Sequence, residues 1–255
     1  PELTAGQGLV QPDSHHLDVL GHSLEALRWL ELLLHDHGQF FGEKSPVFGE
    51  WIGGDFRRAM QLRWAALLHD IGKPITHGIS KGRISFHNHD HAGADMLRRV
   101  ALRLRWARRD GERIARLVAL HMWPFHLNNV RTQTGISRRA CLRLSKAVGE
   151  DLPGLFLLAM ADSLAGNGPG KPTGMEEGLA VLFAEVYQVW LEHIQPVLAL
   201  PPLITGHDLK EVFGLRPGPL FREILSGVEL ARVEGTVADR DQALSWVRLF
   251  LAEPR

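Results

Sequence analysis

The sequence predicts an all-α protein. Apolar residues recur at helical spacing along most of the chain, as they do at Leu17, Leu20, Leu24, Leu27 and Leu30, which is typical of helices that pack one face against a core. No segment of any length shows the alternating pattern of a strand, and no internal repeat is present. With 255 residues, 45% of them hydrophobic, the chain can bury one large core and carry an appendage.

The expected elements follow in order from hydrophobic periodicity and from the capping, glycine and proline residues that mark helix ends. Asp13 or Ser14 is expected to cap the first helix, and glycine and phenylalanine residues predict a long loop over residues 38–54. Further helices are expected over residues 57–70, 90–107, 112–122 (ended by Pro124), 138–148, 155–165 and 175–198, with a loop or short hairpin over residues 73–87 and a loop over residues 166–174. Pro201 and Pro202 end the last of these helices. We therefore expect a body over residues 1–200 and a tail of short helices over residues 201–255.

Charge and cysteine content limit the function classes. The formal net charge is zero, so the whole molecule is not a polyelectrolyte binder. Residues 98–146, however, form a basic tract with few acids, which indicates either a solvated helix face or a surface for a phosphate backbone. The single cysteine, Cys141, cannot pair within the chain, and neither a signal peptide nor a membrane-spanning apolar run is evident. We expect a cytoplasmic protein that does not enter a membrane.

The strongest local signal for chemistry is A-A-L-L-H-D-I-G-K-P, residues 65–74. An apolar helix ends in His69 and Asp70, and an imidazole beside a carboxylate suits a divalent cation, which Asp70 could also bridge to a second one. Lys73 could hold a phosphate oxygen or take part in catalysis. The alternative is an ordinary helix end with a favourable histidine and a surface aspartate.

A second L-H-D triplet, Leu34 to Asp36, has no Gly-Lys-Pro after it. If His35 continues the first helix it lies thirteen positions from His22, or about 20 Å along the axis. We assign this triplet to a solvated helix end. His22 itself is a candidate metal ligand, and Asp18, four residues earlier, could accept its second imidazole N–H; otherwise His22 is an ordinary amphipathic histidine.

Asp162 lies in L-F-L-L-A-M-A-D-S-L-A, which is apolar nearly all round and should be buried. A buried carboxylate is costly unless it is paired or binds metal, so Asp162 is either a ligand or a helix-end residue near solvent. The chain has 14 histidines, many of them between His69 and His126. His89, His121 and His126 are candidates for a second metal or for contact with a substrate phosphate, whereas structural roles for His87 and His91 are at least as plausible.

The order of His22, His69-Asp70, His89, His121 and Asp162 resembles the HD superfamily of metal-dependent phosphohydrolases. The resemblance places His22, His69, Asp70 and Asp162 at the first metal and makes His89 and His121 the residues that complete a second metal. The opening P-E-L and H-H-L-D-V-L-G-H-S, and the closing P-L-I-T-G-H-D-L, L-R-P-G-P-L-F-R-E-I-L and V-E-G-T-V-A-D-R-D-Q-A-L-S-W, resemble the body and tail of bacterial tRNA nucleotidyltransferases. The nucleotide-adding head of that family, with its paired aspartates, has no counterpart in these residues.

These resemblances imply an HD-type helical bundle that hydrolyses a phosphoester with a divalent metal, of which Mg, Mn, Ni, Fe and Zn are not distinguished. The implied substrates are a nucleotide, a 2′,3′-cyclic phosphate or an RNA end, with RNA or tRNA as partner. His89 and His121, with Asp70 and Lys73, would be catalytic, and Lys73 and His126 would bind substrate. We expect one tightly held metal, as the likeness to the tRNA nucleotidyltransferase HD domain implies. The alternative function is a non-catalytic tRNA-binding arm with a structural metal.

Overall fold

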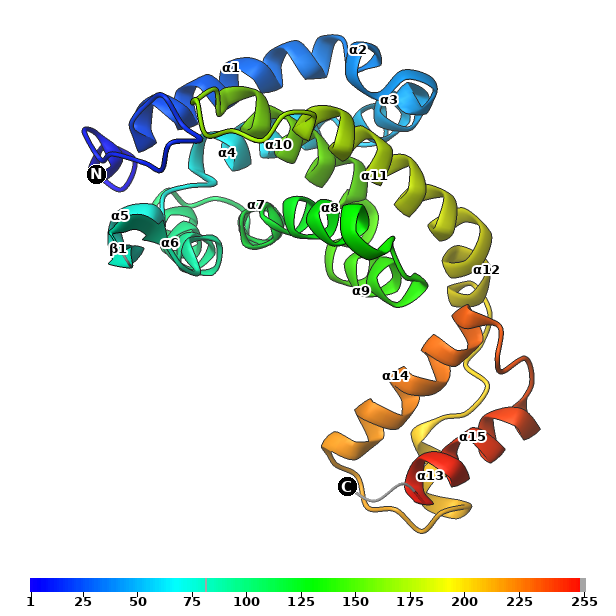
Figure 1. Ribbon diagram of the computed structural model, residues 1–255. Helices are drawn as coiled ribbons and strands as arrows, with labels where there is room; N and C mark the ends of the chain where they lie inside the picture. Colours follow the sequence, from blue (N-terminus) through cyan, green and yellow to red (C-terminus); the bar gives the residue numbers. More distant parts are fainter. Residues whose placement is uncertain (81, 253–255) are drawn as a thin grey trace. The chain divides into compact units, whose positions relative to one another are not determined.

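The structure is a computed structural model that describes residues 1–80 and 82–252 (Figure 1), and the predicted all-α class is confirmed. Within the described residues, the strands form one two-stranded antiparallel hairpin. Contacts divide the chain into two compact units, residues 1–135 with 147–184 and residues 136–146 with 185–255. These bounds differ from the expected boundary at residue 200, and the body-and-tail assignment stays a prediction.

The first unit contains the elements that position the site. They are η1 (Thr4–Gly6), α1 (Val19–His35), α2 (Gly38–Phe41), η2 (Gly42–Lys44), α3 (Ser45–Gly53), α4 (Arg57–Leu68), α5 (Lys73–Thr76), β1 (His77–Ser80), β2 (Arg83–Phe86), α6 (His89–Arg103), α7 (Arg108–Leu120), α8 (Trp123–Thr134), η3 (Gly149–Asp151) and α10 (Leu152–Ala165). Helix α10 is buried almost throughout and packs against α1, α3 and α4, while α7 packs against α4 and α6. The centre of the unit is therefore α10, the helix that carries Asp162, as its apolar sequence predicted.

The sequence predictions for residues 38–54 and for Pro124 were wrong. Residues 38–54 fold into α2, η2 and α3 instead of a loop, because Phe41 and Phe48 pack against each other and against Phe183 of the core. Pro124 does not end a helix but lies in the first turn of α8, where its missing N–H costs nothing. The predicted hairpin alternative is the observed one, with His77 opposite Phe86.

The second unit has a small core of its own. Two helices cross the sequence limits of the units: α9 (Arg138–Val148) and α11 (Met175–Val189). The other elements are η4 (Trp190–Ile194, a π-helical turn), α12 (Gln195–Leu198), α13 (Gly206–Glu211), α14 (Pro219–Glu234) and α15 (Arg240–Ala252). A capping box of Thr205 and Asp208 starts α13, and Trp246 packs so closely on Gly227 that a Cβ there would lie 2.3 Å from the indole.

Among the described residues, no helix combines the length and the apolarity needed to cross a bilayer.

Candidate metal centre

The predicted ligand residues come from helices that are distant in sequence and end near one another. His22 lies on α1 and Asp162 on α10, two helices that pack together. His69 and Asp70 directly follow α4, His121 directly follows α7, and His89 is the first residue of α6. All six side chains are buried. Helix termini thus bring imidazoles and carboxylates to one point inside the unit.

Close backbone approach joins the His-Asp turn to the start of α6. At Gly72 a Cβ would lie 2.1 Å from the carbonyl oxygen of His89 and 2.6 Å from the amide nitrogen of Gly93, so only glycine fits. Asn88, immediately before His89, has a φ of 58°, in the left-handed region that asparagine tolerates better than most residues. The glycine of the His-Asp-Ile-Gly-Lys sequence therefore brings His89 to Asp70.

A first group of ligand atoms consists of His22 Nε2, His69 Nε2, Asp70 Oδ2 and Asp162 Oδ1. His22 Nε2 lies 2.9 Å from Asp162 Oδ1 and 3.6 Å from Asp70 Oδ2. His69 Nε2 lies 3.1 Å from Asp70 Oδ2 and 3.6 Å from Asp162 Oδ1. Two imidazoles and two carboxylates around one point form a donor set that suits a divalent cation.

A second group lies on the other oxygen of Asp70. Asp70 Oδ1 is 3.3 Å from His89 Nε2 and 3.9 Å from His121 Nε2, and the two histidine Nε2 atoms are 3.2 Å apart. The two oxygens of Asp70 thus face different groups of histidines. Asp70, His89 and His121 could hold a second cation, with Asp70 as the bridge.

Hydrogen bonds to the backbone orient three of the imidazoles. The Nδ1 atoms of His69, His89 and His121 lie 2.8, 2.8 and 2.7 Å from the carbonyl oxygens of Ala66, Phe86 and Val118. Because a carbonyl oxygen only accepts, each Nδ1 must carry the proton, and in the neutral ring the lone pair is then on Nε2. This is the tautomer in which an imidazole ligates metal through Nε2.

The centre also contains buried polar atoms whose hydrogen-bonding capacity is unmet. His69 Nε2 and both oxygens of Asp70 make no hydrogen bond of good geometry with the described residues, and of these three atoms only Asp70 Oδ2 has a charged partner, the ammonium group of Lys73. Such atoms are rare in folded proteins because their desolvation is uncompensated. A cation between them would satisfy all three atoms, so the residues present fit a divalent metal.

The electrostatics of the centre also favour a bound cation. Burial alone would lower the pKa of His69, but the carboxylates of Asp70 and Asp162 overcome it and raise this pKa to about 10. Burial would raise the pKa of each carboxyl group, yet neighbouring imidazoles, with Lys73 beside Asp70, hold the pKa of Asp70 and of Asp162 well below its usual range. The centre therefore favours bound positive charge.

Lys73 is buried at the edge of the centre. Its Nζ lies 2.6 Å from Asp70 Oδ2 and donates a hydrogen bond of 2.7 Å to Gln11 Oε1. It also lines a cavity next to Asp162. The structure thus places Lys73 where an ammonium group can both balance the charge of Asp70 and contact a ligand in the cavity.

The expected role of Asp18 was wrong. Its Oδ1 accepts the Gly21 N–H at 2.6 Å and its Oδ2 accepts the Gly8 N–H at 2.7 Å, so both oxygens serve backbone amides. His22 Nδ1 has no hydrogen-bond partner among the described residues. Asp18 is the extended N-cap of α1, in place of Asp13 or Ser14, and its carboxylate turns back over the first helical turn and not along the face of His22.

The assignment of His126 to the substrate site stays a prediction. The His126 side chain is exposed on α8 and does not line the cavity, whereas Met122 and Phe125 of the same helix do. His87 and His91 are exposed. The second triplet lies where we expected it, because His35 ends α1 and both His35 and Asp36 are exposed.

Sequence reasoning missed His15. Its ring packs edge-on against His22 with centroids 4.6 Å apart, its Nδ1 lies 2.9 Å from Ser14 Oγ, and it lines the cavity beside Asp162. Burial, with the nearby charges of Lys73 and His22, lowers the pKa of His15 to about 4. The paired histidines at positions 15 and 16, just before the first helix, were the only signal that could have indicated it.

The fold and this centre define an all-α protein with a buried His/Asp cluster suited to divalent metal. Residues 19–167 match the HD domain family, and the chain belongs to that family. It is 32% identical to the A-adding tRNA nucleotidyltransferase of Deinococcus radiodurans over 255 residues, which cover 99% of this chain and 51% of the relative. It is 28% identical to the CC-adding tRNA nucleotidyltransferase of Thermus thermophilus over 249 residues, 97% of this chain and 48% of the relative.

The expected relationship to HD proteins and tRNA nucleotidyltransferases is thereby confirmed. The chain spans about half the length of these two relatives. HD domains bind divalent metals, and the His/Asp groups of this structure agree with that property.

Proposed function

We propose that this chain is a metal-dependent phosphohydrolase that acts on nucleotides, 2′,3′-cyclic phosphates or RNA ends. The observation that carries the proposal is the convergence of His22, His69, Asp70 and Asp162 at one buried point, with unsatisfied ligand atoms beside a cavity. A cation held there would polarise a phosphoryl oxygen, supply an activated water and neutralise developing charge.

Side chains next to the metal centre would have the remaining roles in the reaction. Lys73 would position the phosphate, because its ammonium group lies between Asp70 and the cavity. His89 and His121 would face the phosphate as proton carriers, since their Nε2 atoms have the lone pairs in the neutral rings and lie beside Asp70 Oδ1, 3.2 Å from each other. Either ring becomes a hydrogen-bond donor at Nε2 once it has taken up a proton. His15 would help to close the cavity side of the centre.

A metal analysis combined with a hydrolysis assay tests the proposal. The purified chain should contain divalent metal by plasma mass spectrometry and should hydrolyse bis(4-nitrophenyl) phosphate or 2′,3′-cyclic AMP. Chelation should abolish turnover and readdition of a divalent cation should restore it. Full turnover after verified metal removal would overturn the mechanism, and bound metal without turnover would favour the RNA-binding alternative.

The variant that replaces His35 and Asp36 with alanine is the matched control for this assay. Both side chains are exposed at the end of α1, and His35 lies thirteen positions from His22, about 20 Å along the helix. We expect metal content and turnover to remain within experimental error of the wild-type values. Loss of metal from this variant would show that the functional His-Asp pair had been assigned to the wrong part of the chain.

RNA or tRNA is the partner that the relatives favour, since both are tRNA nucleotidyltransferases and both are similar to this chain over nearly its whole length. In the first unit, Arg98, Arg103 and Arg113 are engaged with carboxylates. Within the first unit, four exposed arginines of this tract make no ion pair with the described residues: Arg99, Arg105, Arg108 and Arg109. These four are the candidates for contact with phosphate.

Binding of tRNA should weaken steeply with salt. If the four free arginines each neutralise one phosphate, the slope of log K against log[salt] should be about −3. Replacing Arg108 and Arg109 with glutamine should reduce the slope by about two, whereas Arg28→Gln, which removes an arginine paired with Glu25 on α1, should leave it unchanged. Fluorescence anisotropy over a salt series measures this slope. No binding at low salt, or a flat salt dependence, would assign the tract to a solvated face.

A further inference from the structure

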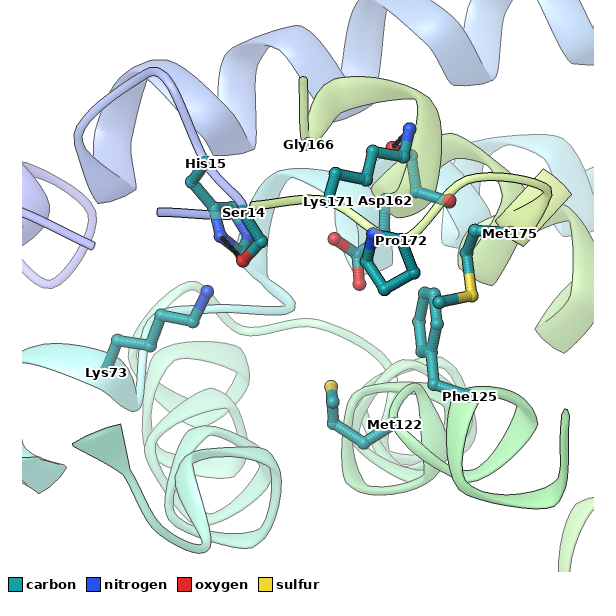
Figure 2. A pocket seen from close by; sticks show the side chains of 11 residues that line it. Ser14, His15, Lys73, Met122, Phe125, Asp162, Gly166, Lys171, Pro172 and Met175 are labelled. Atoms are coloured by element: carbon teal, nitrogen blue, oxygen red, sulfur yellow. Dashed lines mark hydrogen bonds between the residues drawn. The ribbon is translucent and has the colours of Figure 1, made fainter. Parts of the chain in front are cut away.

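A cavity of about 190 Å³ adjoins the metal centre. Asp162, one of the candidate ligands, lies in its wall, and Lys73 lies at its edge (Figure 2). A molecule in this cavity therefore touches the centre directly. The roles of its other lining residues are not explained by metal binding or by phosphate chemistry.

The lining has two chemically different sides. Figure 2 shows Ser14, His15 and Lys73 on one side of Asp162, and Phe125 and Met175 on the other. Met122 and Pro172 add further apolar surface. A ligand that fits both sides has a polar, anionic end near Lys73 and an apolar end near Phe125.

The loop over residues 166–174 is held in place as a wall of this cavity. The amides of Gly168 and Gly170 donate hydrogen bonds of 2.9 Å to the carbonyl oxygens of Ser14 and Asp13. A Cβ at Gly168 would lie 2.2 Å from the Asp13 oxygen, so the two segments meet without room for a side chain. The wall therefore exists before any ligand binds, which favours a shape-selective site.

Lys171 belongs to this wall and is not a free phosphate ligand. Its Nζ donates to the Ser163 carbonyl oxygen at 2.7 Å and forms an ion pair with Glu176. Glu176 also accepts a hydrogen bond of 2.8 Å from Ser163 Oγ. Lys73 is also paired with a carboxylate, but that carboxylate, Asp70, would be shared with the bound cation, so the positive end of the cavity is the side that carries Lys73 and adjoins the metal centre.

We propose that this cavity is a nucleobase subsite, in which Phe125 with Met122 and Met175 contacts the base of a substrate whose phosphate lies at the metal centre. A cavity of about 150 Å³ can hold a benzene molecule, so the observed volume suits one base and not a longer oligonucleotide. The aromatic ring and the polarisable thioethers are suitable partners for a planar base. The substrate is then a free nucleotide or the terminal nucleotide of an RNA. This inference rests on the proposed hydrolysis for the position of the phosphate.

Two phosphomonoester substrates distinguish the contribution of the base from that of the phosphate. The ratio of kcat/KM for 3′-AMP to that for glycerol 2-phosphate, which lacks base and ribose ring, measures the contribution of the subsite. Phe125→Ala should lower this ratio about tenfold, the loss typical of removing an aromatic partner of a base. Phe125→Tyr, which keeps the ring, should restore most of it. Phe56→Ala, which removes an 83% exposed phenylalanine at the start of α4, should change neither rate.

Adenosine binding provides a readout that does not depend on hydrolysis. Calorimetry should detect adenosine binding to the wild-type protein and to Asp70→Asn, and weaker binding to Phe125→Ala. Adenosine binding without hydrolysis of any phosphoester would support the subsite while overturning the proposed reaction. Hydrolysis of both esters with equal kcat/KM, unchanged in ratio by Phe125→Ala and by Met122→Ala, would overturn the subsite while leaving the reaction intact.

Discussion

Replacing Asp70 with alanine should remove the tightly bound metal and abolish metal-dependent hydrolysis. Asp70 is the one residue whose carboxylate faces both groups of histidines, with Oδ2 toward His22 and His69 and Oδ1 toward His89 and His121. Without it, the first group keeps a single carboxylate, Asp162. No other described side chain can replace the lost ligand, because the remaining neighbours of Asp70 are imidazoles and the ammonium group of Lys73.

The same substitution should lower thermal stability in proportion to the binding energy that it removes. A ligand at 100 times its dissociation constant stabilises the folded state by about 2.7 kcal/mol, which corresponds to about 5–10 °C in Tm for a domain of this size. Chelation should lower the Tm of the wild-type protein by a similar amount and leave the Tm of Asp70→Ala unchanged. That difference separates metal loss from general damage to the core.

Asp70→Asn keeps the size of the side chain and serves as the conservative companion variant. It should also lose tight metal binding, because an amide oxygen carries no charge to offset the desolvation of a divalent cation. Plasma mass spectrometry on dialysed protein measures the occupancy of each variant. Full metal occupancy in Asp70→Ala would rule out this centre as the metal site.

The regular helices could be predicted from sequence because their signals are local. Helix α10 shows the strongest case, since its apolar composition predicted both the helix and the burial of Asp162. The short helices α2 and α3 could not be predicted in this way. Their stability comes from contacts with distant residues, such as Trp51 against Gly154, where a Cβ would lie 2.4 Å from the indole.

The candidate centre, too, could be predicted from the sequence only in part. The order of histidines and aspartates indicated which residues meet, and the structure brings His22, His69, Asp70, His89, His121 and Asp162 together. The orientation of each side chain was not accessible. Asp18 accepts a hydrogen bond from a backbone amide at the start of α1 and does not orient the His22 ring. His15 reaches the centre because its segment is hydrogen-bonded to the loop over residues 166–174. Both outcomes depend on backbone hydrogen bonds that spacing in the sequence does not reveal.

Replacing both His89 and His121 with alanine should leave one tightly bound metal and abolish turnover. The first group offers four ligand residues with two carboxylates, whereas the second offers three and must share Asp70. A cation should therefore bind more tightly in the first group, which the double variant leaves intact. The substitutions remove the two imidazoles beside Asp70 Oδ1 that would face the substrate phosphate.

Metal stoichiometry and kcat, measured on the same preparations, decide between one metal and two. We expect one metal per chain in the wild-type protein and in the double variant after dialysis, with turnover lost only in the variant. The His87→Ala, His91→Ala variant is the matched control, because both side chains are exposed next to the same helix start. It should keep metal and turnover. If the wild-type protein holds two metals and the double variant holds one, His89 and His121 are ligands, Asp70 bridges two cations, and the one-metal assignment is wrong.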